Sequence, residues 1–531
     1  MSVRTRYAPS PTGEPHLGNI RTAFFDWLLA RHYGGQFILR IEDTDQARYV
    51  ESGVGAQMDA LRWLGLQWDE GPDVGGPHEP YVQSERLPLY HSHADRLLEE
   101  DKAYRCYCSP ERLDQVRKEQ QARKEPPRYD RHCRDLSSEE RRAQEAAGIT
   151  PVVRFKTPPA GETQTQDVLR GEVTFRNETL DDFVLLKSDG FPTYHLASIV
   201  DDHLMDITHV LRGEEWFRNE TLDDFVLLKS DGFPTYHLAS IVDDHLMDIT
   251  HVLRGEEWLS SLPRHVLLYG AFGWEPPVFA HLSTILGPDR AKLSKRHGAH
   301  AALEYREQGY LPDAVVNFLA LLGWSLDDHT EIIDRATLVK HFDLDRVLPN
   351  PAVFNADKLL WMNGVYIRAL PPEELADQAL PFLERDLGRP LDRALLLRIV
   401  PLVQERIKLL SEITAMADFF FTGDNMAYDI ETLLGKKYGG QPRLAADALG
   451  GVIAAIESVE PWTHDGLEAA VRPLADEIGA KAGDLFGLAR VAITGKTTAP
   501  PLFETMEVLG RERTLARLRQ AAERLEAAGQ R

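Results

Sequence analysis

The sequence predicts an α/β fold that is followed by an all-α domain. Residues 3–45 read as strand, helix and strand, and the chain after Pro371–Pro372 carries apolar residues at helical spacing. A third observation is the length of 531 residues, which exceeds what one hydrophobic core supports. We therefore expect two to four domains.

Composition favours a globular cytoplasmic protein, with 43% hydrophobic and 27% charged residues. No apolar run reaches the roughly 18–20 residues of a membrane span, and the N-terminus lacks the apolar core of a signal peptide. Three cysteines are too few for a disulfide framework, which favours a reducing compartment. The net charge of −23 argues against indiscriminate nucleic-acid binding. Residues 102–134 nevertheless hold ten Lys/Arg against five Asp/Glu, either a basic binding face or a solvated helix.

The first predicted element is a strand that leads through the turn APSPTGEPHLG into a helix ended by Gly34–Gly35. The strand QFILRIEDTD follows, and it places Glu42 beyond its carboxyl end, where open α/β sheets bind ligands. For the helix between these two strands, the apolar spacing predicts an amphipathic helix whose buried side carries Ile20, Phe24, Trp27, Leu28 and Leu29.

The later elements are less regular. From about residue 86 the chain becomes an irregular, basic, cysteine-bearing insert. Residues 265–274 favour a helix that runs into a turn. Helices are expected again from LDRALLLRIVPLVQERIKLLSEI to a last helix around 502–528, separated by Gly and Pro.

An exact internal repeat interrupts the middle of the chain. Residues 175–216 recur letter for letter at 217–258, so that 42 of 42 positions are identical. Solenoids and propellers need at least three diverged units that stack on one another. Two identical copies indicate instead a very recent duplication or an error of sequence assembly.

Two short motifs carry chemistry. In HLGN, a helix N-terminus attracts phosphate, His16 and Asn19 add donors, and Gly18 lets a flat base approach the backbone. In KLSKR, Lys292 and Lys295 can reach developing charge on a phosphoryl group and on the leaving pyrophosphate. Taken singly, the first motif is more often an ordinary capped helix and the second a surface loop.

Together these motifs carry a resemblance. PSPTGEPHLGN followed by KLSKR resembles the nucleotide-binding signatures of class I aminoacyl-tRNA synthetases. RIEDTD, SDGFPTYHLASIVDDHLMDITHVLRGEEW and EYREQGYLPDAVVNFLALLGW resemble the bacterial glutamyl-tRNA synthetases in particular. The similarity extends nearly from end to end, into TGKTTAPPLFETMEVLGRERTL. Removing one copy of the repeat leaves 489 residues, a usual size for that family.

The resemblance implies a fold and a domain order. It implies a Rossmann-like catalytic core split into residues 1–85 and 191–289, with the duplicated segment in the second half. It also implies an acceptor-end insert at 86–190, a lysine-loop and stem-contact region at 290–370, and a helical anticodon-binding domain at 371–531.

The resemblance also implies a reaction. Glutamate attacks the α-phosphate of ATP, with Mg²⁺, to form glutamyl-adenylate, and the acyl group passes to the terminal ribose of tRNA(Glu). A monomer without membrane contact is expected. The positions that match glutamate-binding residues are Arg6, Ala8, Ser10, Glu42, Tyr236 and Arg254, where Tyr194 and Arg212 of the first copy can replace the last two. The positions that match ATP-binding residues are His16, Gly18, Asn19, Lys295 and Trp258, with Lys292 assisting. An amino-dicarboxylate needs cations for its carboxylates and a carboxylate for its amine. Without the resemblance, Arg6 and Glu42 read equally well as a structural ion pair.

The three cysteines all fall in the insert. Cys106, Cys108 and Cys133 form a plausible zinc set, although buried free cysteines are also common. Many relatives have a histidine two residues after the last cysteine, whereas this chain has Asp135 there. We expect Asp135 as the fourth ligand, with His132 in reserve, in a structural site.

Arg406 in the helical tail aligns with a family position that helps to read the third anticodon base. An arginine at that position goes with rejection of tRNA for glutamine. A solvated helical arginine is the alternative interpretation.

The repeat is the second half of the implied active site, which has room for one copy. Extruding the other 42 residues costs about 3 kcal/mol of closure entropy, and its apolar runs favour aggregation. The second copy is favoured because its helix continues into ATP-binding structure, and hybrids that loop out at SDG are also possible.

Two other functions compete with the ligase. A glutamyl transferase acting on a modified tRNA base would lack the long helical tail. A non-catalytic RNA-binding remnant, inactivated by the duplication, is the alternative from another class.

Overall fold

The structure is a computed structural model, and it describes residues 3–43, 49–124, 128–169, 171–177, 180, 182, 184–186, 243–255, 262–293, 301–424, 426 and 429–530. It divides into two compact units. Unit 1 comprises residues 1–306 and 312–356, and unit 2 comprises residues 307–311 and 357–531. The sequence boundary expected at residue 371 falls within unit 2.

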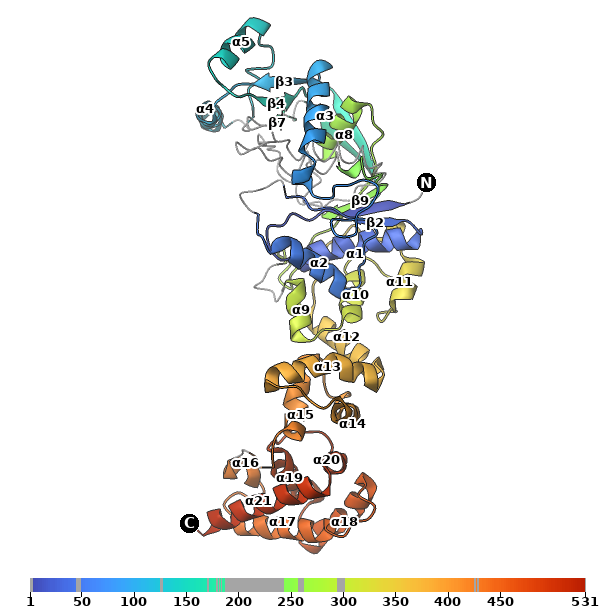
Figure 1. The fold of residues 1–531 in the computed structure, drawn as a ribbon, viewed down its shortest axis with the longest axis vertical. Coiled ribbons are helices and arrows are strands. Elements are labelled where there is room, and N and C mark those ends of the chain that lie inside the picture. Colours follow the sequence, from blue (N-terminus) through green and yellow to red (C-terminus); the bar gives the residue numbers. More distant parts are fainter. Residues whose placement is uncertain are drawn as a thin grey trace. The chain divides into compact units, whose positions relative to one another are not determined.

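Unit 1 is built around a six-stranded sheet in the order β2-β1-β9-β10-β5-β6 (Figure 1). β2, β1, β9, β10 and β5 pair in parallel, and β6 closes an antiparallel hairpin with β5. This α/β core confirms the predicted fold class. The strands are β1 (Arg4–Tyr7), β2 (Gln36–Leu39), β5 (Glu162–Asp167), β6 (Gly171–Arg176), β9 (His251–Gly255) and β10 (Val278–Leu282).

The helix of the first β–α–β unit, α1 (Leu17–His32), packs on β1, β2 and β9. The apolar positions predicted from the sequence are buried, but the prediction of an amphipathic helix is wrong. Arg21 and Asp26 on the expected polar side are buried as well. Arg21 donates to the carbonyl oxygens of Leu322 and Ser283, and Asp26 accepts from the amide of Leu253 in β9 at 3.2 Å. Helices α10 (Pro312–Leu321) and α11 (Arg335–His341) also pack on α1.

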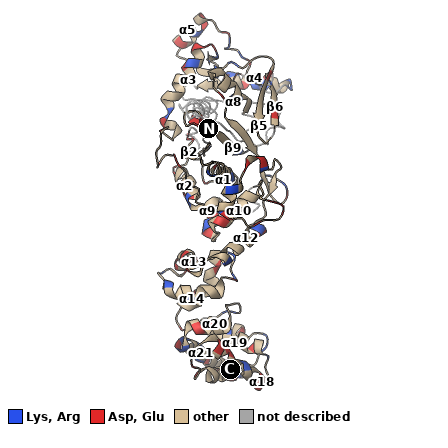
Figure 2. Ribbon diagram, turned by 90° about the vertical axis from the view of Figure 1, so that its right-hand side faces the viewer, with Lys and Arg blue, Asp and Glu red and all other residues tan. Residues whose placement is uncertain are grey.

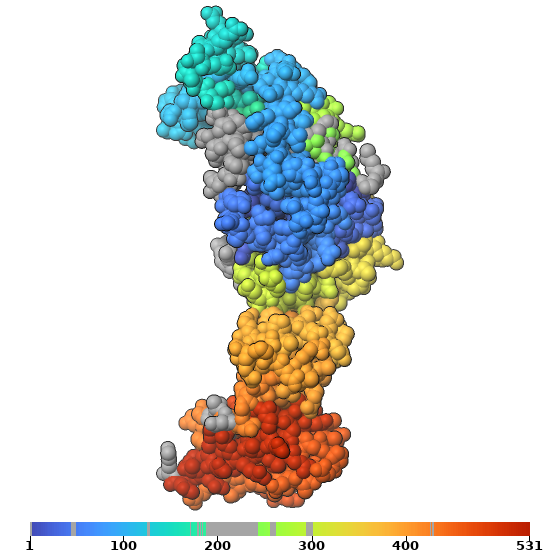
Figure 3. Space-filling view, viewed as in Figure 1, coloured from blue at the N-terminus to red at the C-terminus, as the bar shows by residue number. Residues whose placement is uncertain are grey.

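The insert carries a small antiparallel sheet in the order β3-β4-β7. Its helices α4 and α5 bury no residue and lie on the surface of unit 1 (Figure 3). The strands are β3 (Ala103–Cys106), β4 (Val152–Phe155) and β7 (Val184–Leu186); the helices of this part and its flanks are α2 (Gly53–Trp63), α3 (Leu87–Glu99), α4 (Pro110–Ala122), α5 (Ser138–Ala146), α8 (Leu262–Phe272) and α9 (Ala302–Gln308). A two-stranded sheet pairs β11 (Ile285–Leu286) with β12 (Ala352–Val353).

The described parts of the repeat come from both copies. β7 belongs to the first copy and pairs with β4, whereas β9 belongs to the second copy and lies between β1 and β10. Residues 187–242 between them lie outside the described residues. Among the described residues, the first copy thus supplies β7 and the favoured second copy supplies residues 243–255, which agrees with a hybrid arrangement.

Unit 2 is helical throughout its described length, as predicted. The expected helix through LVQERIKLLSEI stops at Val403, and the last helix is split at Gly510, whose φ of 84° breaks the helical path. The helices are α12 (Ala356–Ala369), α13 (Pro372–Leu387), α14 (Arg393–Val403), α15 (Ile413–Phe421), α16 (Ile430–Leu434), α17 (Pro442–Ile456), α18 (His464–Glu477), α19 (Ala482–Thr494), α20 (Leu502–Leu509) and α21 (Arg511–Gly529).

Acidic and basic residues are interspersed on the helices of both units (Figure 2). Among the described residues, no helix is long and apolar enough to cross a lipid bilayer.

Candidate active site

The predicted glutamate-binding residues meet at the carboxyl edge of the parallel strands. Arg6 lies in β1, and Ala8 and Ser10 follow that strand. Glu42 follows β2, and its amide donates to the carbonyl oxygen of Pro9 at 3.0 Å. Arg254 lies in β9, the other neighbour of β1. The topology brings these residues together because parallel strands end at a common edge.

Arg6 is buried and held by a carboxylate of the second repeat copy. Its Nε and Nη2 donate to the two carboxylate oxygens of Asp244, the second of these bonds being 2.6 Å long. Burial alone would lower the pKa of Arg6, but the charge and hydrogen bonds of Asp244 raise it. The fork of Arg6 therefore faces Asp244, and Nη1 is the nitrogen that this carboxylate does not engage.

Arg40 joins the carboxylates of the pocket, and its side chain is fully buried. It donates from Nη2 to Glu42 Oε1 at 2.9 Å, and its Nη1 lies 2.5 Å from Asp244 Oδ1. Among the described residues, Glu42 Oε2 is buried without a hydrogen-bond partner. Burial raises the pKa of Glu42 to about 8, although Arg40 and Arg6 oppose this rise.

A second carboxylate links the pocket to the start of the insert. Asp243 pairs with Arg86, lies 3.4 Å from Arg40 Nε, and accepts two hydrogen bonds of 2.9 and 3.0 Å from the Tyr90 hydroxyl. The sequence motifs did not indicate Arg40, Asp243 or Asp244. One signal was present, because the adjacent acids Asp243 and Asp244 directly follow the apolar pair Ile241–Val242, and acidic residues beside apolar ones are buried only when they are paired.

Arg254 is buried beside α8. Its Nη2 lies 3.5 Å from His265 Nδ1, and its guanidinium lies 6.0 Å from the centre of the Phe279 ring. This distance places the guanidinium within cation–π range of the ring. Such a cation is suited to a carboxylate ligand.

The HLGN motif forms the N-terminus of α1. His16 is the N-cap, and its Nδ1 accepts from the amide of Asn19 at 3.4 Å. A Cβ on Gly18 would lie 3.1 Å from the His16 ring, so glycine leaves room for this ring position. Desolvation by neighbouring atoms lowers the pKa of His16, although its side chain is partly exposed. The charge of Lys292 lowers this pKa further.

The lysine loop returns to this helix end. The segment after the loop pairs with HLGN through an antiparallel bridge between His16 and Ala301, and the amide of Ala302 donates to the carbonyl oxygen of Pro15. Lys292 is exposed and pairs with Leu286 of β11. The described Lys292 of KLSKR is near enough to HLGN for its charge to act on His16.

Five predicted site residues lie outside the described residues. These are Tyr194, Arg212, Tyr236, Trp258 and Lys295.

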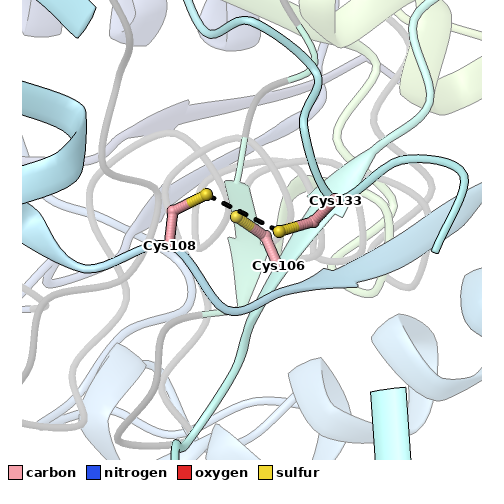
Figure 4. A group of neighbouring side chains, drawn as sticks. All are labelled: Cys106, Cys108 and Cys133. Carbon is pink, nitrogen blue, oxygen red and sulfur yellow. Dashed lines mark hydrogen bonds between the residues drawn. The ribbon is translucent and has the colours of Figure 1, made fainter. Parts of the chain in front are cut away.

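The three cysteines of the insert form one cluster (Figure 4). The Sγ atoms of Cys106, Cys108 and Cys133 lie within 4.8 Å of one another, and Cys108 Sγ lies 3.6 Å from Cys133 Sγ. Hydrogen bonds from Cys108 and Cys133 hold the pKa of the Cys106 thiol well below its ordinary value. Thiolates within this spacing can share one metal ion.

The expected fourth ligand does not join this cluster. Asp135 and the reserve residue His132 are exposed, and neither belongs to the group of sulfur ligands. The buried Tyr129 occupies the neighbourhood instead, with its hydroxyl 3.2 Å from Cys106 Sγ and 3.5 Å from Cys108 Sγ. The same hydroxyl accepts from the amide of Cys133 at 3.0 Å.

Arg406 is exposed just beyond α14. Desolvation lowers the pKa of Arg490 in α19, and the charge of Arg406 lowers it further, which places two cations near each other in unit 2. Neighbouring cations of this kind suit an anionic or hydrogen-bonding partner such as RNA.

Comparisons with known proteins agree with this geometry. A family model for the catalytic domain of class I tRNA synthetases (E and Q) matches residues 2–222 and 217–361, and an anticodon-binding domain model matches residues 374–522. The two catalytic matches overlap at 217–222, where the second repeat copy begins.

Individual relatives cover nearly the whole chain. A glutamate–tRNA ligase of Dehalococcoides mccartyi is 51% identical over 528 residues, covering 98% of each chain. That of Roseiflexus castenholzii is 48% identical, covering 99% of this chain and 97% of its own. The crystal structure of a glutamate tRNA ligase from Elizabethkingia meningosepticum in complex with its amino acid superposes with a TM-score of 0.81 at 35% identity, covering 99% of this chain and 100% of that one. The chain therefore belongs to the glutamate–tRNA ligases, class I tRNA synthetases with a C-terminal anticodon-binding domain.

Proposed function

We propose that the protein joins glutamate to tRNA(Glu) in two steps, using ATP with Mg²⁺. Relatives named for this activity match it over 98% of its length. The observation that carries the proposal is the carboxyl-edge pocket, where cations and one carboxylate with a buried unpaired oxygen lie together. That charge pattern suits an amino-dicarboxylate.

In this proposal, anionic and cationic side chains of the pocket bind different groups of the substrate glutamate. Glu42 accepts the substrate ammonium, and Arg6 and Arg254 receive its carboxylates. Ala8 and Ser10 line the approach beyond β1. Tyr236 is the further contact expected from the second copy, with Tyr194 and Arg212 as the equivalents from the first.

ATP is assigned to the end of α1. The helix N-terminus with His16, Gly18 and Asn19 suits the phosphates and the flat base. Lys292 and Lys295 stabilise the charge that develops on pyrophosphate as adenylate forms. Trp258 of the second copy is the remaining ATP contact.

The test is glutamate-dependent ATP–pyrophosphate exchange with tRNA present, followed by charging of tRNA(Glu). Both activities are expected in the full 531-residue chain. Binding of tRNA without either activity would establish the alternative of a non-catalytic RNA-binding remnant. Full-length identity of about half gives that alternative no support.

We also propose that the cysteine cluster binds one structural zinc ion. Three thiolates supply its sulfur ligands, and the Tyr129 hydroxyl replaces Asp135 as the nearest oxygen donor. The ion would stiffen the 86–190 insert, which we assign to the acceptor end of tRNA.

Arg406 is proposed to contact the anticodon, with Arg490 beside it. Charging of tRNA(Glu) but not tRNA(Gln) is the expected consequence, and a comparison of the two substrates measures it. The proposed oligomeric state is a monomer, which sedimentation checks.

A further inference from the structure

Two hubs of buried charge among the described residues of unit 1, Asp182 and Asp244, are carboxylates that come from different copies of the repeat. Asp182 of the first copy is buried in the insert, where Arg134 donates to it at 2.6 Å and Tyr104 at 3.1 Å. Asp244 of the second copy is buried in the pocket, where it engages Arg6 and Arg40. Each hub has an identical counterpart in the other copy, Asp224 and Asp202 respectively.

We propose that Asp244 is a positioning residue of the glutamate pocket and that the second copy alone supplies it. The inference rests on the proposed function, because it assigns the group that orients Arg6 for the substrate. By taking Nε and Nη2 of Arg6, Asp244 fixes the plane of the guanidinium and leaves Nη1 for a ligand.

Asp244 also determines how the contacts of Arg40 are divided between carboxylates. Arg40 divides its nitrogens between Asp244 Oδ1 at 2.5 Å and Glu42 Oε1 at 2.9 Å. Because Asp244 balances part of the charge of Arg40, Glu42 keeps its Oε2 without a partner among the described residues. Without Asp244, Arg40 is free to turn fully toward Glu42 and to compete with a substrate ammonium.

When Glu42 is ionised, the charges of this cluster balance, which explains how it stays buried. Arg6, Arg40 and Arg86 face Glu42, Asp243 and Asp244, all with side chains no more than 4% exposed. Buried charges are tolerated when they are paired and hydrogen-bonded. Replacing Asp244 by a neutral residue leaves one positive charge in excess beside the ligand site.

The experiment compares Asp244→Asn with Asp202→Asn, the same change at the identical position of the first copy. In Asp244→Asn an amide NH₂ must face an arginine donor, so the Arg6 guanidinium turns. We expect the KM for glutamate to rise about 10-fold or more while the KM for ATP changes little. Asp202→Asn should leave both constants unchanged.

A double-mutant cycle separates positioning from a structural role. If Asp244 acts through Arg6, adding Asp244→Asn to Arg6→Lys should cost much less than the same change in the unmodified protein. Asp244→Glu, which keeps the charge, should restore part of the glutamate affinity. If Asp244→Asn does not fold, the same kinetic comparison is made with Asp244→Glu, whose longer side chain shifts the carboxylate.

Each other outcome overturns the proposal. A lower unfolding temperature with an unchanged glutamate KM would make Asp244 structural. Equal, partial losses in Asp244→Asn and Asp202→Asn would show that the copies exchange. An unmodified chain without exchange activity would instead reject the proposed function itself. Asp182→Asn serves as the contrasting buried-hub variant, and it should loosen the insert without raising the glutamate KM.

Discussion

The carboxyl group of Glu42 titrates in a range that affects glutamate binding. Burial raises its pKa to about 8, so the group is protonated below that pH and charged above it in the free protein. A substrate ammonium requires the charged form. Binding should therefore strengthen as pH rises through this range. An ordinary exposed glutamate, already charged at pH 6, would give no such pH dependence.

We expect the KM for glutamate to fall by about 25-fold between pH 6.5 and 8.5, as a carboxyl group with a pKa of about 8 ionises. ATP–pyrophosphate exchange with tRNA present measures this change. Glu42→Gln should raise the KM and abolish its pH dependence. A pH dependence that persists in Glu42→Gln would move the titrating group elsewhere, for example to Asp243 or Asp244, whose pKa values burial raises to about 6.

Gly18→Ala tests the ATP site through one methyl group. The new Cβ would lie 3.1 Å from Cε1 and Nδ1 of His16, so the imidazole must move away from the helix end. We expect the KM for ATP to rise about 5- to 10-fold, with the KM for glutamate unchanged, because a displacement near 1 Å weakens a well-oriented contact.

Gly55→Ala is the matched control for that substitution. Gly55 lies exposed in α2, and a Cβ there meets no atom within 4 Å. It should leave both KM values unchanged and stabilise the protein by about 0.5–1 kcal/mol, since alanine loses less entropy in a helix. If Gly18→Ala behaves like Gly55→Ala, His16 does not contact ATP.

At the scale of elements, the strand β3 and the loop that carries Cys133 hold the proposed zinc ligands. We expect one zinc ion per chain in purified protein, and none after Cys106→Ser with Cys108→Ser, because structural zinc needs its thiolates. Loss of zinc should lower tRNA affinity and leave glutamate binding intact. Elemental analysis of the purified variants provides the measurement.

The identity of the oxygen donor is tested separately. Tyr129→Phe should weaken zinc retention against a chelator, whereas Asp135→Asn and His132→Ala should not, because both residues are exposed. Zinc lost from Asp135→Asn but kept by Tyr129→Phe would restore the ligand expected from the sequence. Unmodified protein without zinc would reject the site.

Elements also show what the sequence could predict and what it could not. The β1–α1–β2 unit was predictable because apolar spacing and Gly34–Gly35 define it locally. The burial of Arg21 and Asp26 was not, because Arg21 contacts Ser283 and Leu322 and Asp26 contacts β9, all more than 220 residues away in the chain. The cysteine spacing predicted a cluster, but the approach of Tyr129 depends on how the intervening loop folds.

The same reasoning applies to the pocket. Motif matches led to Arg6, Glu42 and His16, yet they did not reveal that two nitrogens of Arg6 donate to Asp244. No pattern within one copy could show which copy supplies a strand, since the two are identical. Chain continuity decides it: β7 follows β6 closely, and β9 leads into α8.

At the scale of the whole molecule, the repeat lengthens one connection. Residues 187–242 join β7 to Asp243, a stretch of 56 residues that would be 14 with one copy. Two doublings in the length of a connection cost about 1.2 kcal/mol of closure entropy. This is less than the figure for closing a separate 42-residue loop, because the shorter connection already bears part of the cost.

Deleting 175–216 or 217–258 yields the same 489-residue protein. We expect this variant to be at least as active and to unfold about 1–2 °C higher, which corresponds to roughly 1 kcal/mol in a chain of this size. Thermal unfolding and charging assays measure both properties. A variant that is less stable would show that the surplus residues contribute to folding. The mass of the protein from its native host shows which length occurs there.

The arginines at equivalent positions of the two copies test which one receives the substrate. Arg254 lies in β9, buried between the strands that carry the pocket, so Arg254→Ala should abolish exchange activity while Arg212→Ala leaves it intact. If the copies compete for this strand position, each single variant should keep substantial activity, since the intact copy fills the site. The double variant should be inactive in either case, because a substrate carboxylate then lacks its cation. Full activity in the double variant would remove both arginines from the pocket. Running the same variants in the 489-residue protein, which has one such arginine, gives the reference value for its loss.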